Sequence, residues 1–171
     1  MKSIFGRDGI ASGSIEHART HAGELYKVGV NNAALGAAAF LYIQLNVPAG
    51  LELHVKAPAV YNSLAATLDL LEAPTITDGT TAIVPRNKKR SSTHDATMTG
   101  RIFSDPTAIS AGTTLDLINF TGALVSPDGP QPSDMEWILK QNTKYVFRLQ
   151  NNGGGASTAF LRLHFYEQLL T

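Results

Sequence analysis

The chain has 171 residues, 43% of them hydrophobic, and its 14 lysines and arginines balance 14 aspartates and glutamates, so that the formal net charge is zero. This length and composition predict one domain with a real hydrophobic core. A neutral chain has no overall field that draws it to nucleic acid or to an anionic membrane, so any polyanion binding has to be local. The sequence has no cysteine, which excludes disulfides, thiol nucleophiles and zinc–thiolate sites.

No apolar run approaches the roughly 20 residues that a membrane span needs, so we expect no membrane association. The first six residues also lack the apolar region of a signal peptide. We therefore expect a soluble protein that is not exported by a cleaved leader.

The first thirty residues contain five glycines, which interrupt every periodic run. This lack of a continuous periodic pattern predicts an N-terminal arm over residues 1–30, ahead of a sandwich domain over residues 31–171. Residues 14–21 could form one or two helical turns, with His17 and His21 on one face at the i and i+4 spacing. Because a zinc site would need a third ligand from elsewhere, we interpret this segment as an exposed polar one and expect no metal.

Residues 41–47 and 51–56 alternate between apolar and polar side chains on either side of a Pro-Ala-Gly turn, which predicts a strand pair. In the second run the leucines and the valine share one face. His54 falls on the other, polar face, so we expect it to face solvent and not to bind a metal.

The middle of the chain carries weaker patterns. Part of residues 58–73 could be helical, whereas residues 75–77, 80–84, 97–103 and 113–120 read as short strands. Between them lies a polar loop with four cations in five residues: Arg86, Lys88, Lys89 and Arg90. Since it lacks interleaved aromatic residues and a glycine-rich phosphate cradle, nucleic-acid binding is unlikely by sequence. We expect a solvated loop or one that meets an acidic partner surface.

The C-terminal part shows the clearest alternation. Residues 143–150 and 161–166 predict a long antiparallel hairpin, turned by the glycine-rich residues 151–157. Its apolar face carries Tyr145, Phe147, Leu149, Leu161, Leu163 and Phe165. With about eight short strands in all, the sequence predicts an all-β fold, an antiparallel two-sheet sandwich of the jelly-roll kind with an extended N-terminal arm.

Catalytic motifs are missing from the sequence. There is no Gly-x-Ser-x-Gly elbow, and the glycines after Asn151 lack the lysine and helix of a phosphate loop. The carboxylates Asp69, Glu72, Asp116 and Glu136 form no pair that the sequence can place together. We expect no enzymatic activity and no cofactor.

A family resemblance is carried by several short patterns. They are Leu71-Glu72-Ala73-Pro74-Thr75, Asp78-Gly79-Thr80, Arg86-Asn87-x-x-Arg90, Ile138-Leu139-Lys140-x-Asn142-Thr143-Lys144-Tyr145-x-Phe147-Arg148-Leu149-x-Asn151 and Phe165-Tyr166-Glu167. Over residues 70–167 the chain resembles small virion proteins of tailed bacteriophages, the head decoration or cement proteins with a β-sandwich fold. The resemblance implies a protein made in the host cytoplasm that binds the outer surface of a capsid and bridges neighbouring copies of the major capsid protein, without a cofactor or a reaction.

Within this interpretation, we expect the arm to reach a capsid neighbour or a second copy. Ile4 and Phe5 would serve as apolar anchors and Arg7 and Arg19 as polar ones, and the cations of residues 86–90 would join them. A homo-oligomer is expected because exposed sandwich edges are often buried between copies, with dimer and trimer equally open.

Two alternatives remain open at this point. One is a carbohydrate- or receptor-binding sandwich of a phage tail or head fibre, with Tyr42, Tyr61 or Trp137 as stacking rings. Trp137 also fits a place in the core or at an interface. The other is an enzyme of the cupin type, which lacks the His-x-His half of its metal pattern here.

Overall fold

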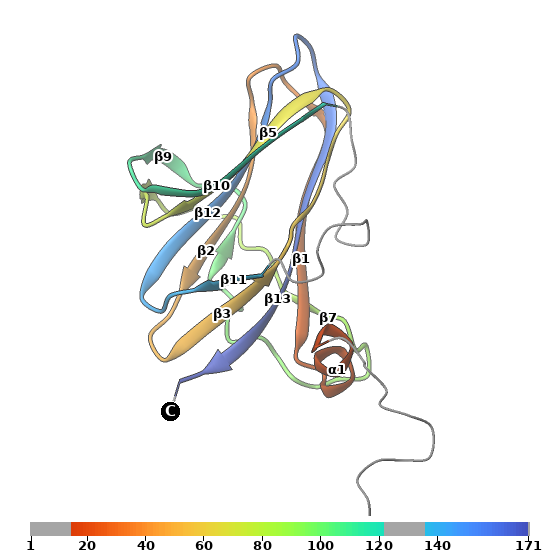
Figure 1. Ribbon diagram of the computed structural model, residues 1–171, viewed down its shortest axis with the longest axis vertical. Coiled ribbons are helices and arrows are strands. Elements are labelled where there is room, and N and C mark those ends of the chain that lie inside the picture. The colour runs from red at the N-terminus through yellow and green to blue at the C-terminus, as the bar shows by residue number, and fades with distance from the viewer. Residues whose placement is uncertain (1–14, 122–135, 171) are drawn as a thin grey trace, which may run out of the picture.

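The computed structural model describes residues 15–121 and 136–170, and strands dominate it (Figure 1). The elements are α1 (Ile15–Ala22), β1 (Leu25–Leu35), β2 (Phe40–Val47), β3 (Leu51–Lys56), β4 (Ala59–Asn62), β5 (Ala65–Glu72), β6 (Thr75–Thr77), β7 (Arg86–Asn87), β8 (Ile102–Phe103), β9 (Thr107–Ser110), β10 (Thr113–Thr121), β11 (Glu136–Leu139), β12 (Thr143–Asn151) and β13 (Ser157–Leu169).

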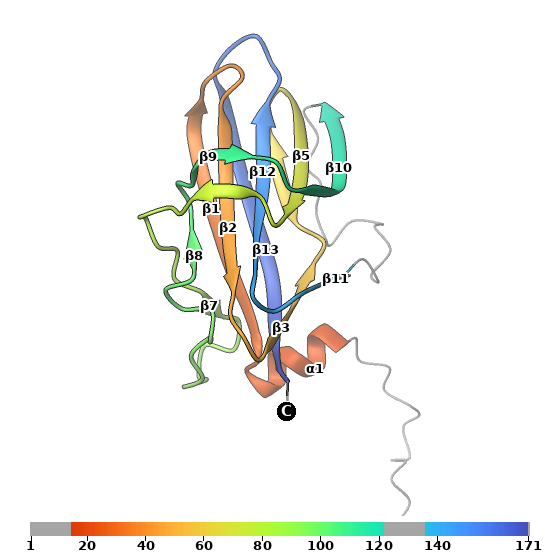
Figure 2. The ribbon, with the colours of Figure 1, turned by 90° about the vertical axis from the view of Figure 1, so that its left-hand side faces the viewer.

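Two antiparallel sheets face each other. Sheet A has the strand order β11-β3-β13-β1-β7, with β4 also paired to β13, and sheet B has the order β10-β5-β12-β2-β8. A third, two-stranded sheet of β6 and β9 crosses the outer face of sheet B (Figures 1 and 2). The helix α1 lies at the end of the sandwich where β7 is found (Figure 1).

The long strands pair in a nested order. β1 pairs with β13, β2 with β12, β3 with β11 and β5 with β10, so the first strand meets the last and the middle strands meet each other. Four such pairs distributed over two sheets are the arrangement of a jelly roll. The predicted all-β, antiparallel two-sheet sandwich is therefore confirmed.

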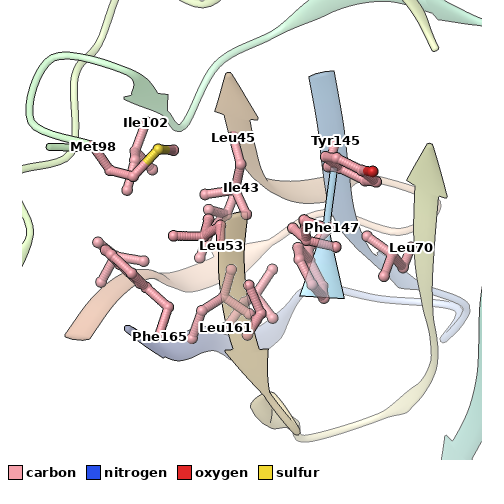
Figure 3. Packing of buried hydrophobic residues seen from close by; sticks show 14 of the residues in the cluster. Ile43, Leu45, Leu53, Leu70, Met98, Ile102, Tyr145, Phe147, Leu161 and Phe165 are labelled. Carbon is pink, nitrogen blue, oxygen red and sulfur yellow. The ribbon is translucent and has the colours of Figure 1, made fainter. Parts of the chain in front are cut away.

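The core lies between the two sheets (Figure 3). Tyr145 and Phe147 of sheet B, with Leu161 and Phe165 of sheet A, are each at most 1% exposed. Fully burying a side chain of this size contributes roughly 1.5–3 kcal/mol. The apolar face predicted for residues 143–166 is thus the centre of the core.

The two predicted hairpins are wrong in their pairing. β2 and β3 lie in opposite sheets, and so do β12 and β13, so each short connection joins one layer of the sandwich to the other. Alternation along a strand specifies which face is buried, but it does not specify the neighbouring strand. Both strands of each expected hairpin do turn their apolar face inward, toward the same core from opposite sides.

Weaker segments also differ from expectation. Residues 58–73 form β4 and β5 and no helix, because Val60, Leu68 and Leu70 alternate into the core. Of residues 97–103 only the last two are a strand, and residues 80–84 contribute a single bridge, from Ala82 to Phe103.

The predicted boundary at residue 30 lies inside β1. Leu25 is fully buried and Val28 is 2% exposed, so the sandwich starts before the expected arm would end. The expected helical turns are present as α1, which ends at Ala22 and is followed by Gly23 with a backbone φ of 78°. Gly29 does not break β1, because a strand tolerates glycine where another chain segment approaches closely. A Cβ at Gly29 would lie 2.8 Å from the Cγ of Arg162.

Candidate interaction groove

One edge of sheet A is largely open. β13 pairs with β1 along most of its length, but on the other side β7 pairs only with Tyr26 and Lys27. Beyond Lys27, residues 28–33 have no strand partner on this side among the described residues. The chain between β6 and β7 descends past β8 on the side of the molecule where β1 lies (Figure 2). Residues 82–84 and Arg86 of this segment and residues 27–33 of β1 enclose a groove of about 820 Å³.

Positive charge lines this groove. Lys27, Arg86 and Arg162 border it, and a second hollow of about 510 Å³ shares Lys27 and Arg86 and adds Lys88 and Arg90. We call the two hollows together the β1 groove. All five cationic residues are exposed, and none of the described residues that line the groove is acidic. On a chain of zero net charge, this is a local concentration of one sign.

The position of Arg162 depends on two neighbours. Its side chain passes over Gly29, where only the absence of a Cβ leaves room for it. Its guanidinium carbon lies 4.7 Å from the centre of the Phe160 ring, a cation–π contact, and Tyr61 stacks on the same ring at 5.7 Å. The arginine is therefore held along the floor of the groove.

One backbone and one side-chain hydrogen bond fix the cationic loop to the chain at the start of β1. The Lys88 N–H donates to the Leu25 carbonyl at 2.9 Å, and the side-chain amide of Asn87 donates to the Gly23 carbonyl at 2.7 Å. The Lys89 ammonium instead donates to the His21 carbonyl at 2.9 Å, at the end of α1. Of the four predicted loop cations, Arg86, Lys88 and Arg90 line the groove, whereas Lys89 ties the loop to the helix.

The other predicted interface residues lie elsewhere. Ile4, Phe5 and Arg7 are outside the described residues. Arg19 donates to Glu24 at 2.5 Å, and its guanidinium carbon lies 4.7 Å from the centre of the Tyr166 ring. It borders a separate hollow of about 330 Å³ beside the end of β13, so the fold does not bring it into the β1 groove.

The groove also contains residues that sequence reasoning did not select. The place of Arg162 on the polar face of its strand was visible in the sequence, whereas Lys27 fell within the expected arm, where no strand was predicted. Their proximity to Arg86 was not visible, because it depends on β1 lying between β13 and β7 in sheet A.

His54 does not face solvent as expected. It is 7% exposed, its Nδ1 lies 2.5 Å from Oε1 of Glu136, and Tyr166 stacks on its ring at 4.4 Å. The face was assigned correctly, but the edge strand β11 places Ile138 opposite His54 and Glu136 opposite Lys56, which covers that face. The His54 Nε2 has no hydrogen-bond partner among the described residues.

Glu136 is the centre of this buried cluster. The Tyr166 hydroxyl donates to it at 2.6 Å, and Lys56 forms an ion pair with its other oxygen. Burial alone would raise the pKa of Glu136, but the hydrogen bonds from Lys56, Tyr166 and His54 outweigh it and lower that pKa. Burial and the adjacent carboxylate raise the pKa of Tyr166 to about 12. The cluster fastens the edge strand β11 to β3 and β13.

The three candidate stacking rings have different surroundings. Trp137 turns inward and meets Phe147 edge-on, with ring centres 6.4 Å apart, as expected of a core residue. Tyr42 stacks on Phe40 at 5.6 Å. Tyr61 lies beside the β1 groove through its contact with Phe160.

Residues 15–121 and 136–170 include neither a cluster of metal-ligand side chains nor a membrane-spanning helix. They contain no group of three or more histidine, aspartate or glutamate side chains placed to hold a metal ion. No helix in these residues is long and apolar enough to cross a membrane.

Comparison with protein-family models, with curated proteins and with solved structures finds no match to this chain.

Proposed function

We propose that this chain is a structural virion protein that binds the outer surface of a phage capsid and stabilises it by bridging neighbouring copies of the major capsid protein. The observation that carries the proposal is the β1 groove, where five exposed cations and no acidic residue line an open strand edge. The resemblance of residues 70–167 to decoration proteins supports the same function.

The physical properties of the chain suit this role. A decoration protein has to stay soluble before assembly and then bind a repeated surface, which favours zero net charge together with a local, complementary patch. A sandwich with a continuous core supplies a rigid body that can hold two subunits at a fixed spacing. We include a dimer or trimer in the proposal, with no catalytic role and no cofactor.

Copy number tests this function directly. In purified particles that contain the polypeptide, quantitative mass spectrometry would measure its ratio to the major capsid protein. A ratio of the same order as the capsid protein is expected for a decoration protein. A handful of copies per particle would assign it to a tail or fibre, and absence from the particle would refute a virion role.

A second candidate is a carbohydrate- or receptor-binding sandwich of a tail or head fibre. It is favoured by one observation, the stacked Tyr61–Phe160 pair at the groove, where Phe160 lies opposite Asn31 of β1. Saturable binding on a glycan array, lost in Tyr61→Ala, would select this candidate, and no glycan binding would leave the capsid function ahead.

A further inference from the structure

We infer that the β1 groove binds an extended, acidic segment of a partner protein, which adds to the free edge of β1 as a further strand of sheet A. The inference rests on the proposed function only for the identity of the partner, a capsid subunit. The mode of binding follows from the groove itself.

The backbone of β1 has free pairing groups in the groove. The Leu25 carbonyl accepts the N–H of Lys88, so the main chain of Leu25 faces the β7 side. In an antiparallel ladder the hydrogen-bonding direction alternates from residue to residue. Gly29 and Asn31 therefore direct their N–H and C=O groups to the same side as Leu25, beyond the end of β7. An unpaired edge of this kind is a template for another strand.

The groove has the size and walls for such a strand. Residues 28–33 present an edge of about 20 Å at the rise of a β-strand. The opposite wall is formed by Ala82, Ile83 and Val84, and Val84 is 53% exposed. An added strand could thus bond to β1 on one side and place an apolar side chain against Val84 on the other.

The charges indicate an acidic occupant. Successive side chains of a strand point to opposite faces, so every second residue of the added strand would point toward the outer face of sheet A. On that face it would meet Arg162 and Arg86, with Lys27 and Arg90 near the end of the groove. The β1 edge of a second copy fits poorly, because a two-fold pair would place these cations against each other.

A protein segment is favoured over nucleic acid. Single-stranded nucleic acid is bound by aromatic rings on which bases stack. The one aromatic ring lining the groove, that of Phe160, is already in contact with Arg162 and Tyr61. The free backbone groups of Gly29 and Asn31, at strand spacing, match another polypeptide backbone.

A labelled peptide tests this mode of binding on the intact chain. The probe has about eight residues, the length of a short strand, and alternates glutamate with valine or threonine. The control peptide has the same sequence, but alternate backbone amides are N-methylated, which keeps the charge and removes the strand's donors. A third probe is oligothymidylate of similar length. Fluorescence anisotropy would measure each affinity at low and at physiological salt.

We expect saturable binding of the first peptide, weakened at least about tenfold by N-methylation and weakened by salt. Equal binding of the N-methylated peptide would refute strand addition, and tighter binding of oligothymidylate would assign the groove to nucleic acid. No peptide binding would refute the inference but leave the proposed function standing if the copy number in particles is high.

Variants locate the peptide on the protein. Arg162→Glu and Arg86→Glu should each weaken binding about tenfold, whereas Arg101→Glu, also exposed but not lining the groove, should leave it unchanged. Asn31→Pro removes a backbone donor at the free edge and should abolish binding, while Asn31→Ala keeps that donor and should retain it. Loss of binding in Arg101→Glu, or retention in Asn31→Pro with an unchanged circular dichroism spectrum, would overturn the inference.

Discussion

The amide of Asn151 fastens the two sheets together at one end of the sandwich. Asn151 ends β12 in sheet B and is fully buried. Its Nδ2 donates to the carbonyls of Leu35 at 3.0 Å, Gly36 at 3.0 Å and Gly155 at 2.8 Å. Its Oδ1 accepts the N–H of Gly153 at 3.0 Å. Because Leu35 ends β1 in sheet A, a single side chain joins both layers.

The substitution Asn151→Asp changes only the donor end of this side chain. The two hydrogens of the Nδ2 group are shared among three carbonyl oxygens, and the oxygen that replaces Nδ2 can donate to none of them. The loss corresponds to two hydrogen bonds of about 1 kcal/mol each. A further 1–3 kcal/mol, roughly, comes from buried polar groups that are left without a partner. We therefore expect the free energy of unfolding to fall by about 3–5 kcal/mol at pH 7. The exposed neighbour provides the control, because Asn152→Asp removes only one solvent-exposed hydrogen bond, to the Thr67 hydroxyl, and should cost less than about 1 kcal/mol.

The loss in Asn151→Asp should depend on pH. In the folded state the introduced carboxyl faces carbonyl oxygens, which raises its pKa above the ordinary value of about 3.9. Between the two pKa values the folded state binds more protons than the unfolded state, so the stability of the variant falls as pH rises. Relative to the wild type, the variant should recover part of its loss as the pH is lowered from 7 toward 4.5.

Urea unfolding of both variants and the wild type at several pH values measures these changes. With a slope of about 2 kcal/mol per molar urea, a loss of 3 kcal/mol moves the midpoint by roughly 1.5 M. A midpoint of Asn151→Asp that matches that of Asn152→Asp at pH 7 would refute the structural role of the amide. A loss that does not shrink in acid would refute its assignment to the buried carboxylate.

Two further predictions concern stability. Glu136→Gln should cost about 1–3 kcal/mol at pH 7, because it removes the charge that His54, Tyr166 and Lys56 surround. The pKa of Glu136 is lowered from 4.5 in the folded state. The difference in stability between the wild type and Glu136→Gln should therefore be complete above pH 4.5 and vanish as the pH falls through the folded pKa. Urea midpoints of the two proteins that differ equally at all pH values would contradict this prediction. Gly153→Ala should cost roughly 1–3 kcal/mol, because its Cβ would lie 2.6 Å from Leu64. The control Gly154→Ala has open space around its Cβ and should be nearly neutral. Thermal melts of the two variants measure this difference, and equal melting temperatures would show that the loop adjusts freely.

The sequence was sufficient for the fold class and for the buried faces. Strict alternation in residues 143–150 and 161–166 identified Tyr145, Phe147 and Phe165 as core residues, since a period of two directly encodes a half-buried strand. The strand partners could not be derived. A hairpin and a connection between facing sheets need the same alternation and the same turn residues, and only the packing of the whole chain selects between them.

The candidate site was predictable to a similar extent. Four cations in a polar loop were visible as a surface feature, and three of them line the β1 groove. The rest of the groove is formed by strands that are distant in sequence, since Lys27 and Arg162 meet only through the pairing of β1 with β13. His54 shows the same limit, because its burial comes from Glu136 and Ile138, about eighty residues further along the chain.

Several residues of the patterns on which we base the proposed resemblance to decoration proteins hold the fold together. Glu72 accepts hydrogen bonds from Tyr145 and Lys140. The Glu167 carboxylate accepts two backbone N–H groups, those of residues 97 and 98. Arg86 and Arg90 of the same patterns instead line the β1 groove. The resemblance therefore combines residues that hold the sandwich together with two cations of the surface to which we propose that the partner binds.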